Sequence, residues 1–262
     1  MIKRILVAID TSSASESALS VAASLCGIMK AELIGLFVED TSRFLSNDDS
    51  ATEAEIESES MKLYGKFQQS CDKAQIEGRF LSIRGIPKDV IRERAKTVDF
   101  VIVGNMGDPN VGNKKPGLTV QGLLATVARP VLVVPADVAG EPMMVVAYDG
   151  SLSSDRLLCA AVELAEISEM SSLHLVTVAS TTEDCQAVQA PALDYLSAYP
   201  LHVTPVCLTG KPEEALLAYV EQVDASILAI AAFGPNRVKE SVFGSTTGKV
   251  LLQNDVAVLL VS

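Results

Sequence analysis

The stretch RILVAIDTSSASESALS, at residues 4–20, decides how this sequence is interpreted. An apolar run ends at Asp10, serines follow, and an Ala- and Leu-rich segment comes next. The same succession returns at residues 144–160 as MVVAYDGSLSSDRLLCA, where the apolar run ends at Asp149. A buried strand, a turn and a helix are therefore predicted twice. The S-x-x-E spacing from Ser13 to Glu16 predicts a capping box at the start of the first helix.

Further segments recur in the same order. VDFVIVGNMGDPNVGNKKPG (98–117) is matched by ASILAIAAFGPNRVKESVFG (225–244), and in each copy two glycines enclose nine residues. ARPVLVVP (128–135) is matched by the terminal DVAVLLVS (255–262). Such ordered self-similarity indicates an internal duplication.

The two copies predict two domains, residues 1–137 and 142–262, joined by a short linker that contains Pro and Gly. GIPKDVIRERA (85–95) and GKPEEALLAYV (210–220) each predict a helix with Pro at its first position. The second domain is expected to be shorter, with only a modest second helix near residues 183–198.

Within each domain, apolar runs alternate with helical segments, and the runs carry little polar interruption. Such runs are typical of a parallel sheet that is buried on both faces. We therefore predict an α/β fold of two doubly wound, five-stranded parallel-sheet domains with strand order 3-2-1-4-5. The strands expected in the first domain are residues 3–9, 31–38, 79–84, 99–104 and 130–134.

The composition of the chain excludes several classes of binding partner. The 262 residues are 48% hydrophobic and carry a formal net charge of −12, with a pI near 4.6. Nucleic acid and anionic membrane surfaces are excluded as partners, because binding them requires clustered Lys and Arg. The N-terminal apolar run is too short for a signal peptide, and no run reaches the ~18–20 residues of a membrane span. A soluble, cytoplasmic protein is expected.

Cysteine and histidine give no sign of a metal site or a catalytic residue. The five cysteines are scattered without CxxC spacing, and we expect them to be reduced thiols. His174 and His202, the only histidines, each lie in a strand-like run without a spaced partner. Neither metal ligands nor a His-dependent triad is predicted.

The ends of the first and fourth strands carry the residues that suggest a ligand. In a sheet of the predicted order, both ends lie at the switch point, where ligands bind outside the carboxyl ends of the strands. Asp10 and Asp149 offer acceptors there, and the glycine loop that follows the fourth strand offers backbone N–H groups to phosphate. The alternative is an ordinary loop in which the glycines only permit turns.

The pattern G-x-x-G-x9-G-[ST], together with an Asp that ends the first strand, resembles the universal stress protein family. The resemblance covers essentially the whole chain, taken as a tandem two-domain member. It implies that an adenine nucleotide such as ATP, with or without Mg²⁺, binds one or both domains. In such proteins the aspartate and a valine closing the second strand contact adenine, and the glycines with the following Ser/Thr contact ribose and phosphates. The matching positions are Asp10, Val38, Gly104, Gly107, Gly117 and Thr119 in the first domain, and Asp149, Val178, Ala231, Gly234, Gly244, Ser245 and Thr246 in the second.

Each domain departs from the family pattern at one position. Leu118 stands where the first domain should have a hydroxyl, and Ala231 stands where the second should have its first glycine. Three functions remain open: a nucleotide-binding regulator of the stress response, a slow ATP hydrolase, and a protein without nucleotide that works through its surfaces. The last strands, Val131–Val134 and Val258–Val261, would leave apolar edges, so we expect them to pair in an intramolecular pseudo-dimer, with a homodimer of whole chains also open.

Overall fold

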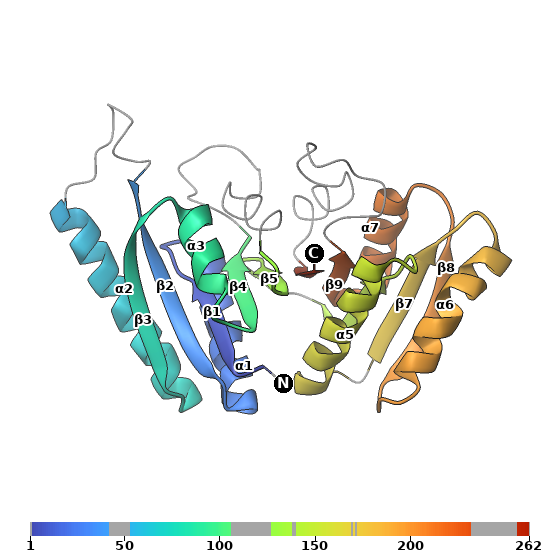
Figure 1. Ribbon diagram of the computed structural model, residues 1–262, viewed down its shortest axis with the longest axis horizontal. Coiled ribbons are helices and arrows are strands. Elements are labelled where there is room, and N and C mark those ends of the chain that lie inside the picture. The colour runs from blue at the N-terminus through green and yellow to red at the C-terminus, as the bar shows by residue number, and fades with distance from the viewer. Residues whose placement is uncertain are drawn as a thin grey trace. The chain divides into compact units, whose positions relative to one another are not determined.

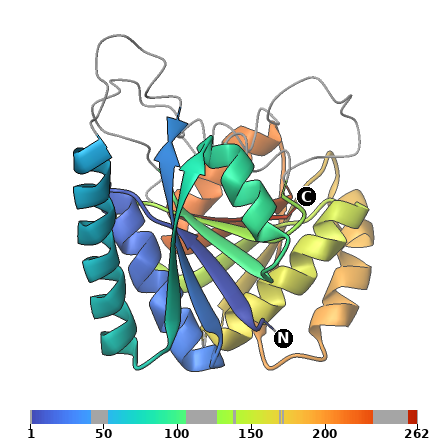
Figure 2. The same cartoon turned by 60° about the vertical axis from the view of Figure 1, so that its left-hand side comes forward.

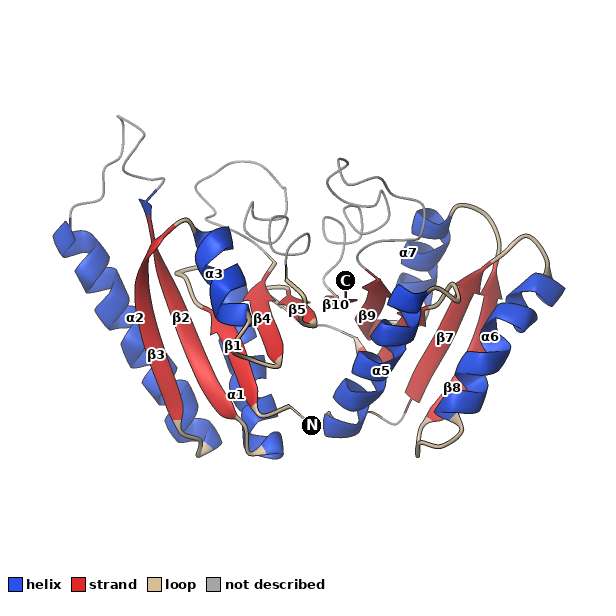
Figure 3. Ribbon diagram, viewed as in Figure 1, coloured by secondary structure: helices blue, strands red, loops and turns tan. Residues whose placement is uncertain are grey.

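The computed structural model describes residues 2–41, 53–105, 127–137, 140–168, 170, 172–231 and 256–261. The chain divides into two compact units, Met1–Asp137 and Val138–Ser262. Strands alternate with helices along each unit (Figure 1). In each unit the strands form a layer that the helices flank (Figure 3). The α/β class predicted from the sequence is confirmed.

The first unit contains parallel strands in the order β3-β2-β1-β4-β5. Helices α1 and α2 pack together on one face of this sheet, and α3 covers the other (Figure 2). The elements are β1 (Arg4–Ala8), α1 (Ser13–Met29), β2 (Glu32–Asp40), α2 (Glu53–Ala74), β3 (Gly78–Gly85), α3 (Pro87–Ala95), β4 (Phe100–Gly104) and β5 (Val131–Val134).

The second unit repeats this arrangement, with parallel strands in the order β8-β7-β6-β9-β10. Helices α5 and α6 pack together on one face, and α7 covers the other. The elements are β6 (Glu141–Ala147), α5 (Leu152–Ile167), β7 (Ser172–Val178), α6 (Thr182–Leu196), β8 (His202–Leu208), α7 (Pro212–Gln222), β9 (Ala225–Ala231) and β10 (Ala257–Val261).

The starts of the helices follow from local hydrogen bonds. Helices α3 and α7 begin at Pro87 and Pro212, as predicted, because proline has no N–H to leave unpaired in the first turn. The predicted capping box from Ser13 to Glu16 is wrong by one residue. The N-cap of α1 is Ser12, whose hydroxyl accepts the backbone N–H of Ser15 at 3.1 Å.

The second helices of the two units are attached to their sheets differently. Helix α2 inserts the fully buried ring of Phe67, which packs against Phe80 of β3 with ring centroids 5.7 Å apart. Gly35 and Gly78 make room for this ring, since a Cβ at either position would lie 2.6 Å from it. The shorter α6 is instead joined to β8 by a covalent bond.

That bond is a disulfide between Cys185 of α6 and Cys207 of β8, with the Cα atoms 5.9 Å apart. The expectation that all cysteines are reduced is therefore wrong for these two. Their separation of 22 residues carries no motif, and they meet only because α6 packs on β8. Cys26 and Cys71 are buried thiols, and burial raises the pKa of Cys26 to about 12, with a further contribution from Cys71. Cys159 is an exposed thiol.

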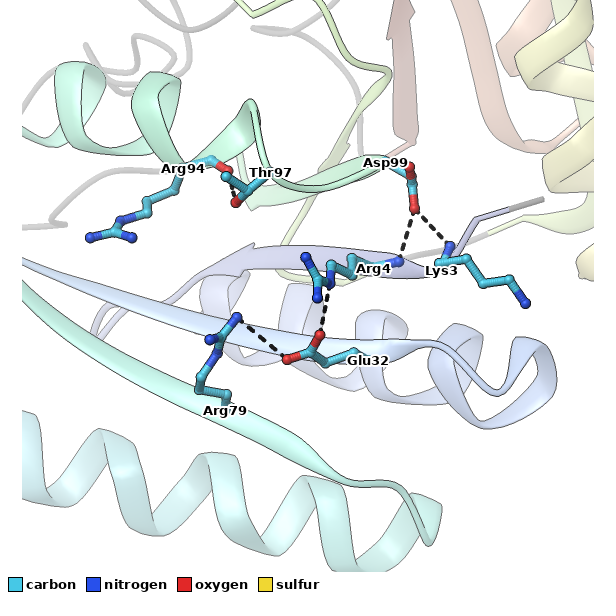
Figure 4. A network of polar contacts seen from close by, with 7 residues as sticks. All are labelled: Lys3, Arg4, Glu32, Arg79, Arg94, Thr97 and Asp99. Carbon is cyan, nitrogen blue, oxygen red and sulfur yellow. Dashed lines mark hydrogen bonds and ion pairs between the residues drawn. The ribbon is translucent and has the colours of Figure 1, made fainter.

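A carboxylate ties the starts of β1 and β4 together. Asp99 Oδ2 accepts the backbone N–H groups of Lys3 at 2.8 Å and of Arg4 at 3.0 Å (Figure 4). Beside it, Glu32 pairs with the guanidinium groups of Arg4 at 2.9 Å and Arg79 at 3.4 Å. These ion pairs are exposed and contribute little to stability. The two backbone hydrogen bonds join the amino-terminal ends of β1 and β4, at the edge of the sheet opposite Asp10 and Gly104.

Candidate functional site

The site predicted in the first unit lies at the carboxyl ends of β2, β1 and β4, which are neighbours in the sheet. Val7 of β1 pairs with Gly35 of β2 on one side and with Ile102 of β4 on the other. Two residues after Val7, just past the end of β1, Ile9 donates its N–H to Leu36 O of β2 at 2.8 Å. Gly104 is the last residue of β4, and Asp10 lies two residues past Ala8, the last residue of β1. Val38 lies two residues before Asp40, the last residue of β2, so the expectation that Val38 closes this strand is wrong by two residues. The three residues nevertheless lie on adjacent strands, toward their carboxyl ends.

Asp10 organises the turn that starts α1. Its Oδ1 accepts the backbone N–H of Ser12 at 2.9 Å and the hydroxyl of Ser12 at 2.5 Å. The N–H of Asp10 itself donates to Ser15 Oγ at 2.8 Å. Both serines are buried, whereas Asp10 is exposed at the edge. The aspartate thus has one carboxylate oxygen committed to the turn and presents its side chain at the surface.

Gly104 lies directly against this turn. A Cβ at Gly104 would stand 2.8 Å from the backbone nitrogen of Ser15 and 2.8 Å from the carbonyl carbon of Ala14. The glycine is therefore required for close packing of β4 on the first turn of α1. Ser15 touches both predicted site residues, since its Oγ accepts from Asp10 and its backbone abuts Gly104.

The second unit places its predicted residues in the same register. Val146 of β6 pairs with Leu175 of β7 and with Ala229 of β9. Asp149, Val178 and Ala231 consequently occupy the register positions that Asp10, Val38 and Gly104 occupy in the first unit.

Asp149 organises the turn before α5, whose N-cap is Ser151. The backbone N–H of Ser151 donates to its Oδ1 at 3.0 Å, and Ser151 Oγ in turn accepts the N–H of Ser154 at 3.2 Å. Burial opposes ionisation of Asp149, but hydrogen bonds from Ser151 and Ser154 outweigh it and lower the pKa of the carboxyl. An ionised carboxylate at a strand end accepts hydrogen bonds from a base amino group or a ribose hydroxyl.

The two units differ at matched positions of this turn. Where the first has Thr11, the second has Gly150 with φ +75°, a left-handed conformation that favours glycine. Where the first has Gly104, the second has Ala231. Each unit thus has one glycine at this junction, in the strand in one case and in the turn in the other.

Tyr148 stabilises the turn between β6 and α5 in the second unit. The sequence did not predict a role for it. Its buried hydroxyl donates to Asp155 Oδ1 at 2.7 Å, and its carbonyl accepts Thr177 Oγ1 at 2.8 Å. Burial first, and then the hydrogen bond to Asp155, raises the pKa of Tyr148 to about 12. These contacts join the ends of β6 and β7 to the start of α5.

The capping serines were also missed, although the sequence contains their signal. Both turns have the spacing D-x-S-x-x-S, as Asp10-Thr-Ser-Ser-Ala-Ser15 and Asp149-Gly-Ser-Leu-Ser-Ser154. The remaining predicted site residues lie outside the described residues: Gly107, Gly117, Thr119, Gly234, Gly244, Ser245 and Thr246.

The described part of the chain contains no group of three or more His, Cys, Asp or Glu side chains placed to hold a metal ion. None of its helices has the length and apolar character needed to cross a membrane.

The model of the universal stress protein family matches residues 1–135 and 182–262. The chain belongs to this family. The universal stress protein Slr1230 of Synechocystis sp. is 28% identical over 178 residues, covering 67% of this chain and 62% of that relative. The chain thus spans less than two thirds of the length of that curated relative.

Solved structures share the fold over nearly the full length. The crystal structure of a universal stress protein from Archaeoglobus fulgidus covers 99% of this chain and 98% of its own, with a TM-score of 0.79 and 22% identity. A protein of unknown function from Pseudomonas aeruginosa, PA1789, covers 99% of this chain and 92% of its own, with a TM-score of 0.69 and 16% identity. The prediction of a tandem family member is confirmed.

Proposed function

We propose that this universal stress protein binds ATP or a related adenine nucleotide at the carboxyl edge of one or both units and acts as a regulatory module of the stress response. One observation carries the proposal. In each unit, the aspartate that follows the first strand, the valine near the end of the second strand and the small residue that ends the fourth strand occupy matching register positions on adjacent strands, toward their carboxyl ends. This is the switch point at which doubly wound sheets bind ligands.

The chemistry of these residues suits a nucleoside. Asp149 is ionised and accepts hydrogen bonds, and Val178 is half-buried at the end of its strand, where a planar base is able to meet an apolar side chain and backbone groups. The phosphates would be bound by the glycine loop of the second unit, at Gly234, Gly244, Ser245 and Thr246. This role rests on the sequence pattern alone. Mg²⁺ would be bound together with the nucleotide, coordinated by its phosphates.

The first experiment asks whether nucleotide is bound. Protein purified without added nucleotide is denatured, and the released small molecules are identified by mass spectrometry. Calorimetry with ATP and Mg²⁺ on nucleotide-free protein gives the stoichiometry and the affinity. If no adenine nucleotide is released and ATP produces no binding heat, the proposal is abandoned in favour of a protein that works through its surfaces.

Matched glycine variants assign the site to a unit. Gly244→Val adds a side chain to the glycine loop of the second unit, and Gly117→Val does the same in the first. We expect Gly244→Val to remove binding in the second unit without unfolding it. Gly65→Ala, in helix α2, is the control because a Cβ there meets no atom within 4 Å. Unchanged affinity in Gly244→Val and Gly117→Val would show that these are not the binding loops.

The oligomeric state of the chain and any hydrolysis of ATP need separate measurements. Light scattering of the purified chain tests whether whole chains form a homodimer, which the sequence left open. Hydrolysis of labelled ATP faster than about one turnover per minute would favour the hydrolase over the binding module.

A further inference from the structure

The Cys185–Cys207 disulfide lies close to the turn that follows Val178. Cys185 lies in the first turn of α6, four residues after its N-cap Thr181. Cys207 lies next to Leu208, whose carbonyl accepts the N–H of Ala179 at 3.0 Å. The turn between Val178 and α6 is thus fixed at one end by the hydrogen bond to β8 and at the other by the start of α6. The disulfide connects α6 directly to β8.

Helix α6 has few other anchors. Its buried side chains form a single narrow stripe: Cys185, Gln189, Ala192 and Leu196. Gln189 donates through Nε2 to Leu175 O of β7 and to Val206 O of β8, each at 2.9 Å. The disulfide is the anchor nearest the start of α6. Helix α2 of the first unit is attached instead by Phe67, whose ring lies tilted against that of Phe80.

The two bonded cysteines differ in burial. Cys185 is fully buried, whereas Cys207 is exposed on β8, the outermost strand in the order of its unit. Thiol–disulfide exchange needs an attacking thiolate to reach one sulfur in line with the bond. Of the two bonded cysteines, Cys207 is the residue exposed to solvent, so we take its sulfur as the point of attack.

We propose that this disulfide is a reducible latch, opened at Cys207 by a dithiol reductant, which orders the turn between β7 and α6. One thiolate of the dithiol attacks Cys207 Sγ, and the Cys185–Cys207 bond breaks as Cys185 leaves as a thiolate and takes up a proton. The second thiolate of the dithiol then attacks the sulfur that the first one contributed, which forms the oxidised reductant and releases Cys207 as a thiol after protonation. Two electrons pass from the dithiol to the protein.

Opening the latch frees the start of α6 from β8. The turn from Ala179 to Thr181 then loses one of its two fixed ends, so its backbone hydrogen bonds open more often. Val178 ends the strand just before this turn, and its position in the candidate site becomes less well defined. The consequence for a bound nucleotide rests on the proposed function, whereas the consequence for the turn does not.

The primary test uses the intact protein without nucleotide. Backbone hydrogen exchange is measured before and after treatment with dithiothreitol, and alkylation followed by mass analysis counts the accessible thiols. We expect Cys159 alone to react readily in the oxidised protein, and Cys207 to join it after reduction. Amides of residues 179–186 should exchange about tenfold faster or more after reduction, with α2 unchanged.

Two variants sharpen the result. A double variant, Cys185→Ala with Cys207→Ala, should exchange rapidly at residues 179–186 with or without dithiothreitol. Cys159→Ser, which removes a thiol outside the bond, should respond to the reductant as the wild type does. A disulfide that resists dithiothreitol in the folded protein overturns the latch, and so does a bond that is reduced without any change in exchange of the turn.

Nucleotide binding gives a separate measurement. In the Gly117→Val background, which confines binding to the second unit, the Kd for ATP should rise about fivefold or more after reduction. An unchanged Kd overturns the coupling between latch and site. Absence of binding in both redox states counts against the proposed function, and the exchange data then decide the latch by themselves.

Discussion

A Cβ atom at Gly104 would lie 2.8 Å from the backbone nitrogen of Ser15. The obstacle is backbone in the first turn of α1, which Asp10 and Ser12 hold in place, so it is unable to move aside as a flexible side chain would. The glycine at the end of β4 is therefore explained by strand–helix packing, in addition to any role toward a ligand.

Gly104→Ala should consequently destabilise the first unit by about 1–3 kcal/mol, the usual cost of overpacking. Urea unfolding followed by circular dichroism measures the change. Gly65→Ala provides the control, because its Cβ meets open space in the interior of helix α2 and alanine there should stabilise by about 0.5–1 kcal/mol. Equal stability of Gly104→Ala and the wild type would mean that α1 yields easily.

Ala231 occupies the position of Gly104 in the repeated register, so its methyl group is expected to face the start of α5, away from a ligand. Removing that methyl should therefore change the Kd of the second unit for ATP by less than about threefold, equivalent to under about 0.7 kcal/mol. Calorimetry on Ala231→Gly checks this. A large gain in affinity would show that the methyl group crowds the sugar.

Asp99 should make the stability of the first unit depend on pH. Hydrogen bonds from the backbone of Lys3 lower the pKa of its carboxyl despite partial burial, with the N–H of Arg4 adding to the effect. A lowered folded pKa gives stability that is complete above the unfolded value, about 3.9, and is lost as pH falls through the folded value. Asp99→Asn should cost about 1 kcal/mol at pH 7.

The difference between wild type and Asp99→Asn is the quantity to follow across pH. It should stay constant from pH 7 to pH 5 and shrink below pH 4, as the wild-type carboxyl becomes protonated. Chemical unfolding at a series of pH values measures it. A difference that persists undiminished at pH 2 would assign the effect to the shape of the side chain and not to its charge.

The sequence predicted the sheets well, since continuous apolar runs such as β4 and β10 have few alternatives to burial in a parallel sheet. It also placed the strand-end aspartates, because a carboxylate that ends an apolar run is conspicuous. It missed the Cys185–Cys207 bond, which depends on how α6 packs on β8 and leaves no local pattern. It assigned Gly104 only a role in contacting the ligand, because a sequence does not show which atoms a Cβ at that position would meet. The roles of Gly107, Gly117, Gly234 and Gly244 stay predictions.

Gln189 tests how α6 is held when the disulfide is intact. Its buried amide donates to two strand carbonyls, and replacing it with methionine keeps the volume but leaves both acceptors without this donor. Gln189→Met should destabilise the second unit by about 1–3 kcal/mol. Gln186→Met, on the exposed side of the same helix, should stay within about 0.5 kcal/mol of the wild type. Urea unfolding of both variants under non-reducing conditions makes the comparison. Equal stabilities would mean that the disulfide alone secures α6.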